Sequence, residues 1–224
     1  MQTYTRQSPL HFPLSPQETV VHKGWKVALS FPAEEAAPLA MIDLSHAAKW
    51  ELYGAQLEGR RVGSLPIPTV PGGASVQAGL VVGLCRPSTA LVWQLPGDDG
   101  LVSFDGVLVT ETTDGWALLA MLGKDAARLF EKVSDLDLAR RSDENARLVQ
   151  GPVLDIPARV LVLYGNDMTP GLLLAVARGY GQSVADAMLD AGAEYGLRPA
   201  GENRFRRWLK KWSMGSAARQ EDVR

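Results

Sequence analysis

The sequence is poor in the residues that build disulfide and metal sites. It has one cysteine, Cys85, in 224 residues, so an internal disulfide framework is excluded and a reducing compartment is expected. Its three histidines, His11, His22 and His46, are scattered and have no cysteine close by. A zinc site, which needs several such ligands together, is therefore not expected.

Long apolar runs are also missing. No stretch reaches eighteen apolar residues, and the Pro-containing start "MQTYTRQSPLHFPLSPQ" has no apolar core of a secretory leader. The formal net charge of −2 gives no general attraction to nucleic acid or membrane. Neither a GxGxxG nor a Walker A motif occurs. We expect a cytoplasmic protein with no nucleic-acid partner and no membrane partner.

What the chain does contain is a normal core composition with short apolar runs, 46% hydrophobic and 21% charged residues. Alternating patterns and turn residues predict strands over 22–31, 49–54 and 158–164, and a hairpin within 76–97. The predicted fold class is α+β with two similar lobes. The predicted divisions are an extended arm (1–19), a first α+β lobe (20–97), a second α+β lobe (98–201), and a basic aromatic helix with a mobile tail (202–224).

A short internal repeat supports two similar lobes. When Gly54 is aligned with Gly123, "DLSHAAKWELYGAQ" lies over "TTDGWALLAMLGKD". Each copy has a polar turn, a strand, a glycine and the start of a helix, which suggests strands backed by a helix in each lobe. Asp43, Ser45 and His46 in the first copy are interpreted as a turn into the strand, because neighbours on a strand point to opposite faces.

Two helices are predicted near the end of the chain. Over 183–196, Ser183 with Asp186 resembles a capping box and Gly196 is a C-terminal stop. In "NRFRRWLKKW" (203–212), Asn203 caps the helix and one face is aromatic; its members are Phe205, Trp208, Leu209 and Trp212.

Two interpretations of the C-terminal helix remain open. The aromatic face either packs on the same chain or docks with Arg206 and Arg207 into an acidic groove of a partner protein, because Trp and Arg are favoured at interfaces.

Three segments carry a family resemblance. "DLSHAAKWELYG" (43–54), "TETTDGWALLAMLGKDAARLFEKVSDLDL" (110–138) and "VARGYGQSVADAMLDAGAEYGLRPAG" (176–201) resemble, in this order, segments of the glycine-cleavage T-protein (aminomethyltransferase) family. The chain is most similar to the gamma-subunit branch of heterotetrameric sarcosine oxidase. The resemblance implies a T-protein-like folate-binding fold with ferredoxin-like pieces.

Two acidic positions of the T-protein family are not acidic in this sequence. Active T-proteins carry a carboxylate near the reacting folate nitrogen, but the equivalent "GASVQAGLVVGLCRP" (73–87) has no Asp or Glu. Gln182 stands where the family places a pterin-reading glutamate. We therefore expect no catalytic residues and no metal ligands. If the cleft holds tetrahydrofolate, the resemblance suggests Arg178, Tyr180 and Trp116 as the residues that face the pterin.

Three functions follow from these observations. The preferred one is a non-catalytic T-protein-like subunit that assembles with a larger flavin- or folate-dependent subunit of an amine-oxidising complex. The alternative is a free-standing tetrahydrofolate-binding protein, or an aminomethyl- or methyltransferase with altered chemistry. A structural or regulatory binder unrelated to folate is the third.

Overall fold

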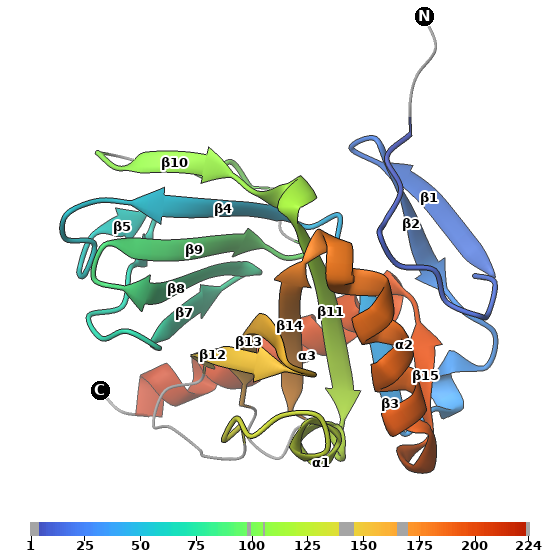
Figure 1. Ribbon diagram of the computed structural model, residues 1–224. Helices are drawn as coiled ribbons and strands as arrows, with labels where there is room; N and C mark the ends of the chain where they lie inside the picture. Colours follow the sequence, from blue (N-terminus) through green and yellow to red (C-terminus); the bar gives the residue numbers. More distant parts are fainter. Residues whose placement is uncertain (1–4, 98–99, 105, 139–145, 165–169, 223–224) are drawn as a thin grey trace, which may run out of the picture.

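Two sheets organise the molecule. The computed structural model describes residues 5–97, 100–104, 106–138, 146–164 and 170–222, with side chains to 214. A six-stranded sheet has the order β12-β13-β14-β11-β3-β15 and a five-stranded sheet the order β10-β4-β9-β8-β7. Figure 1 shows the five-stranded sheet beside the upper part of the long strand β11.

The six-stranded sheet is antiparallel except for the parallel pair β15–β3. Its strands are β3 (Leu39–Asp43), β11 (Trp116–Gly123), β12 (Ala146–Val153), β13 (Ile156–Leu163), β14 (Gly171–Ala177) and β15 (Leu197–Ala200). The five-stranded sheet contains β4 (Ala48–Tyr53), β7 (Ala74–Gln77), β8 (Leu80–Arg86), β9 (Thr89–Gln94) and β10 (Leu108–Glu111).

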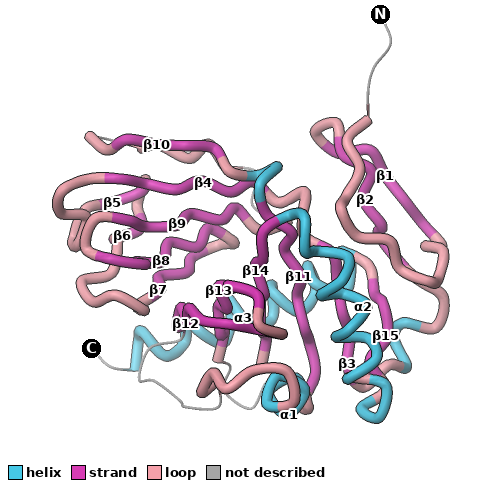
Figure 2. Tube along the Cα trace, in the orientation of Figure 1, coloured by secondary structure: helices cyan, strands magenta, loops and turns pink. Residues whose placement is uncertain are grey.

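Alternation along β11 places the core on both faces of the six-stranded sheet. Ala117, Leu119 and Met121 point to one face, where they pack with helices α1 (Ala126–Glu131) and α2 (Gly181–Ala191). Leu118, Ala120 and Leu122 point to the other face, towards the five-stranded sheet and α3 (Glu202–Asp222). The sheet is therefore covered on both sides, as Figure 2 shows with the helices in cyan.

The opposite face of the five-stranded sheet has its own small core. Leu52, Val82 and Val92 pack there against the segment 57–67, which includes the short strands β5 (Arg61–Val62) and β6 (Leu65–Pro66). β6 has only two residues, because Pro66 lies in it and Pro68 follows, and proline cannot donate a hydrogen bond to a sheet.

The chain start forms a hairpin that the sequence patterns did not predict. β1 (Glu18–His22) pairs with β2 (Trp25–Ser30), whereas a single strand over 22–31 was expected. The turn between them holds Lys23 at φ 47 and Gly24 at φ 80. Two consecutive left-handed residues form a tight hairpin turn. Such turns usually have Asn, Asp or Gly at the first position, so the Lys23–Gly24 pair did not indicate a turn.

Strand pairing crosses the predicted boundary at residue 97. β3 from the first predicted lobe lies in the six-stranded sheet beside β11, and β10 from the second lies in the five-stranded sheet beside β4. Two separate lobes of similar plan are therefore not confirmed. What is shown is a sheet-rich α+β fold whose two sheets exchange strands.

The internal repeat has a different structural meaning. In the first copy the chain passes from β3 in the six-stranded sheet to β4 in the five-stranded sheet. In the second copy it passes the opposite way, from β10 to β11. The turns lie together, because the Leu44 N–H donates to the Leu118 carbonyl (2.8 Å) and the Thr112 N–H to the Lys49 carbonyl (2.8 Å). We call residues 43–49 and 112–116 the crossover.

The helices differ from the predictions at their ends. α2 begins at Gly181 with Tyr180 before it, so Ser183 lies inside the helix and makes no cap. α2 ends at Ala191, and Gly196 follows a short 3-10 turn at φ 67, where a left-handed residue is needed. α3 begins at Glu202 rather than after an Asn203 cap and continues to Asp222, past the predicted start of a mobile tail.

Candidate functional site

The first arm of the crossover is the turn that the sequence predicted for "DLSH". The Ser45 N–H donates to Asp43 Oδ1 (2.9 Å), and the Ala47 N–H donates to the Leu44 carbonyl (2.9 Å). The Ser45 hydroxyl oxygen accepts from the Leu118 N–H (3.2 Å). Asp43 and Ser45 thus shape the backbone as it changes sheets, and a serine–histidine nucleophile pair is not formed.

Lys49 is the most unusual side chain of the crossover. It is fully buried, with 0% of its surface exposed, and its Nζ donates to the carbonyls of Ala47 (2.6 Å) and Ser45 (2.8 Å). Burial lowers the pKa of its ammonium group from 10.5 to about 7, and the nearby carboxylates of Asp43 and Asp114 oppose this shift. Lys49 is thus held inside the turn rather than presented to a ligand.

A polar group links the two sheets beside Lys49. Arg159 Nη1 on β13 donates to Glu51 Oε1 on β4 (2.7 Å), and the Tyr53 hydroxyl also donates to Glu51. Burial works to raise the pKa of Glu51, but the bonds from Tyr53 and Arg159 outweigh it and lower this pKa. Lys49, Glu51 and Tyr53 alternate along β4, so they share one strand face.

Trp116, predicted to face a pterin, lies at the end of this polar group. The Arg159 guanidinium lies 4.4 Å from the centre of its ring. Trp116 also lines a pocket of about 370 Å³ together with Arg6, Glu111 and residues 112–115. Its indole is therefore partly covered by Arg159 and partly open to a shallow site.

Arg178 and Tyr180, the other two predicted pterin residues, do not line that pocket. Arg178 Nη2 donates to the Gln7 carbonyl (2.9 Å), and its guanidinium lies 5.7 Å from the Trp25 ring centre. Tyr180 precedes α2 and is 53% exposed. The three residues thus do not gather around one ring-sized site, and their role in pterin binding stays a prediction.

Gln182, at the position where the family resemblance implies a glutamate, binds the backbone of His11. Its Oε1 accepts from the His11 N–H (2.6 Å), and its Nε2 donates to the His11 carbonyl (3.1 Å) and to Asp186 Oδ1 (2.8 Å). A carboxylate could accept the first bond but could not donate the second. The neutral amide thus ties the N-terminal arm to α2.

The aromatic face of α3 packs on its own chain. Phe205 is fully buried, Trp208 is 9% exposed, and Trp212 is 2% exposed. The Trp212 indole N–H donates to the Tyr164 carbonyl (2.7 Å). Of the two open interpretations, packing on the same chain is confirmed, and these three residues offer no surface to a partner in this structure. Partner binding through Arg206 and Arg207 stays a prediction.

The N-terminal end of α3 is fixed by a buried carboxylate. Glu202 is 2% exposed; its Oε2 lies 2.6 Å from His46 Nε2, and its Oε1 accepts from Arg206 Nε (2.6 Å) and lies 2.5 Å from Arg206 Nη2. Burial works to raise the pKa of Glu202, but His46 and Arg206 together lower it. From the sequence, His46 was interpreted only as part of a turn, and its contact with Glu202 was not predicted.

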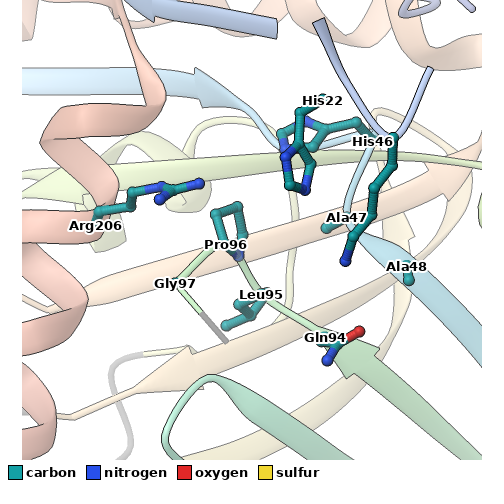
Figure 3. A pocket seen from close by; sticks show the side chains of 10 residues that line it. His22, His46, Ala47, Ala48, Gln94, Leu95, Pro96, Gly97 and Arg206 are labelled. Carbon is teal, nitrogen blue, oxygen red and sulfur yellow. The ribbon is translucent and has the colours of Figure 1, made fainter. Parts of the chain in front are cut away.

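A small pocket opens beside His46, as Figure 3 shows. It measures about 40 Å³, and its polar lining comes from His22, Lys23, His46, Gln94 and Arg206. We call it the crossover pocket. Pattern reading missed it because its residues lie far apart in the sequence and no motif joins them.

Neither metal sites nor reactive thiols emerge in the described part of the chain. No cluster of three metal-ligating side chains occurs among these residues. Cys85 is buried, and burial raises the pKa of its thiol, which disfavours the reactive thiolate. No described helix is long and apolar enough to cross a membrane.

Comparison with known proteins supports part of the resemblance. No family model matches the sequence. Over 106 residues the chain is 31% identical to sarcosine oxidase subunit alpha of Rhizobium meliloti (strain 1021). The matched region covers 42% of this chain and 10% of that protein. The chain thus spans about one tenth of the length of this curated relative.

A solved structure gives a broader match. The chain superposes with a TM-score of 0.56 and 15% identity on heterotetrameric sarcosine oxidase from Corynebacterium sp. U-96 in complex with pyrrole 2-carboxylate, covering 71% of this chain and 86% of that chain. These comparisons establish a sarcosine-oxidase-related fold, and they leave the gamma branch unconfirmed.

Proposed function

We propose that this chain is a non-catalytic subunit of a sarcosine-oxidase-like, amine-oxidising complex, in the gamma-subunit branch. The observation that carries the proposal is the fold match, which spans 86% of one chain of a hetero-oligomeric enzyme rather than a fragment of it. This support is an analogy of fold, at a TM-score of 0.56 and 15% identity, and it makes the chain a candidate for a similar place in an assembly.

The polar side chains at and beside the crossover support a structural rather than a catalytic role for this chain. Lys49 binds two carbonyl groups, and Glu51 is held by Arg159 and Tyr53. A general base or acid must reach a substrate proton, but Lys49 is fully buried. These polar groups thus satisfy one another and hold the two sheets together.

The exposed side of α3 supplies a surface for the partner. Arg207, Lys210 and Lys211 are exposed, and Arg206 is half-exposed at the same helix. The opposite, aromatic side is anchored in the core, so this basic face is presented by a fixed helix. A partner surface rich in Asp and Glu complements it, and the proposed partner is a larger flavin-dependent subunit.

The proposal is tested by purifying the tagged full chain from its own host. A larger, flavin-containing polypeptide should co-purify in fixed stoichiometry, with the flavin seen in its absorbance spectrum. A monomer that leaves the column with no stoichiometric partner would contradict the proposal.

Charge-removal variants test the proposed surface. In Arg207→Gln, Lys210→Gln, Lys211→Gln, we expect slower association with the partner and weaker salt dependence of binding. The matched control removes three exposed cations elsewhere, Lys26→Gln, Lys124→Gln, Arg198→Gln, and should retain the partner.

Free-standing tetrahydrofolate binding is the second candidate. The pocket beside Trp116 favours it, because an aromatic ring and the carboxylates of Glu111 and Asp114 lie around about 370 Å³. Calorimetry with tetrahydrofolate measures this directly. Heat that disappears in Trp116→Ala but persists in Trp50→Ala, whose ring packs against Phe104 elsewhere, would support it; no heat at millimolar ligand would exclude it.

A further inference from the structure

We propose that the outer edge of strand β1 pairs with β1 of a second copy of this chain. β1 and β2 form a two-stranded sheet, and among the described residues no other strand pairs with β1. Figure 1 shows β1 on the outer side of this hairpin, away from the two large sheets. The proposal goes beyond the proposed function and does not use the basic face of α3, so each can fail without the other.

The backbone groups of Thr19 and Val21 face this outer edge. Neighbouring residues of an antiparallel strand direct their N–H and C=O groups to opposite edges. On β2, the Lys26 N–H donates to the Arg6 carbonyl (3.0 Å), so Lys26 faces the N-terminal arm. Val21 is paired with Lys26 and therefore faces the opposite way, as does Thr19 two residues before it. Within the described chain, the arm thus pairs with one side of the hairpin and the β1 side stays unpaired.

The side chains of β1 leave this edge open to pairing. Edge strands commonly resist association through a lysine, a proline or a charge at an outward position. The outward residues of β1, Thr19 and Val21, are uncharged and β-branched, which suits a strand. Val20 and Val21 are 41% and 62% exposed, so both faces of the strand present apolar surface next to the edge.

The exposed edge of β10 differs in charge. The Thr112 N–H donates to the Lys49 carbonyl, so alternation directs the backbone groups of Val109 and Glu111 outward. Glu111 is exposed and brings a carboxylate to this edge. A charged outward position disfavours strand addition, so β10 serves as the comparison for β1.

The edge of β1 is complementary to itself. Only a two-fold axis at Val20 places both outward residues of each strand in pairs, with Thr19 of one copy opposite Val21 of the other. The pairs are then between β-branched residues, including Val20 with its own copy. Glu18 lies opposite His22 of the other copy and not opposite the other Glu18, so like charges do not face each other. This symmetry makes a second copy the occupant that the edge fits.

The association should be weak, because pairing over five residues buries less surface than a stable interface needs. We expect a dissociation constant on the order of 10–100 µM, measured by sedimentation equilibrium of the full chain at up to about 1 mM. Val21→Pro removes an outward N–H without removing a bond to β2, and should raise this constant at least about tenfold. Val109→Pro makes the same change at the edge of β10 and should leave it unchanged.

Cysteine substitutions test the register. Directly opposite residues in a non-hydrogen-bonded pair have Cα atoms about 4.5 Å apart, which a disulfide can span. Val20→Cys should therefore give a disulfide-linked dimer on mild oxidation, and the native Cys85 is buried. Val21→Cys is the matched control at a more exposed position. Its two copies would lie two residues apart along the paired strands, roughly 7 Å of rise, so it should cross-link far more slowly.

Several results would overturn the proposal. A monomer at every concentration would do so, as would a dimer that Val21→Pro leaves intact. Equal cross-linking of Val20→Cys and Val21→Cys would refute the register even if Val21→Pro disturbs the hairpin. In material purified from the native host, a disulfide between Val20→Cys and a larger polypeptide would assign the edge to a different protein and contradict pairing between copies. The presence or absence of a flavin-containing partner bears only on the proposed function.

Discussion

Arg159 Nη1 on β13 lies 2.7 Å from Glu51 Oε1 on β4, and this ion pair joins the two sheets. Both side chains are largely buried, with 18% and 12% of their surface exposed. The same guanidinium lies over Trp116, so one arginine holds a carboxylate and an aromatic ring at the sheet junction. Because the pair is screened little by water, losing one partner leaves the other charge poorly compensated.

We predict that Glu51→Gln lowers the free energy of unfolding by about 1–3 kcal/mol, because Arg159 loses its charged partner in a largely buried place. Urea denaturation at pH 7 measures the change. Glu18→Gln on the exposed strand β1 is the matched control and should change stability by less than about 0.5 kcal/mol. Equal, small effects of both variants would show that the ion pair contributes little.

Lys49 should make stability depend on pH. Its pKa is about 7 in the folded chain and 10.5 as the ordinary value, so between these values the unfolded chain binds the extra proton. The free energy of unfolding should therefore rise with pH across this window, by at most about 1.4 kcal/mol per pH unit, and this gain is lost as the pH falls to 7.

Lys49→Met should remove this rise, whereas Lys26→Met, at an exposed position of β2, should keep it. Urea unfolding at pH 7, 8 and 9 measures all three proteins. An unchanged slope in Lys49→Met would show that Lys49 stays protonated in the folded chain.

Gly171 and Trp208 test the packing of α3. A Cβ atom at Gly171 would overlap the Trp208 ring, whereas one at Gly179 meets no atom within 4 Å. Gly171→Ala should destabilise the chain by about 1–3 kcal/mol, and Gly179→Ala should be close to neutral. Thermal unfolding, together with the Trp fluorescence spectrum, measures both. A neutral Gly171→Ala would mean that α3 is not seated as described.

Gln182 should hold the N-terminal arm in place. Gln182→Ala removes both bonds to His11, and Asp186→Ala removes only the Gln182–Asp186 bond. We expect faster hydrogen exchange of the His11 amide and faster proteolysis within residues 5–17 in Gln182→Ala alone. The same effect in Asp186→Ala would contradict the prediction, because that variant retains both bonds between Gln182 and His11.

The sequence by itself determined the elements whose residues carry a regular pattern. Strands β4 and β13 and the hairpin β8–β9 follow from alternation and turn residues, and the turn of Asp43 and Ser45 follows from their short polar side chains. The one-sided aromatic pattern of 203–212 also indicated a buried face, because residues three and four apart share one side of a helix.

Only the tertiary structure decided which strands pair, what the repeat means and which polar groups meet. β3 and β11 are separated by more than 70 residues, and a strand pattern does not specify its partner. Glu202 and His46 meet for the same reason, through the docking of α3 across the sheet. Burial of Lys49 likewise could not be read from its residue type, since lysine is rarely buried and only the closing of the two turns around it removes it from water.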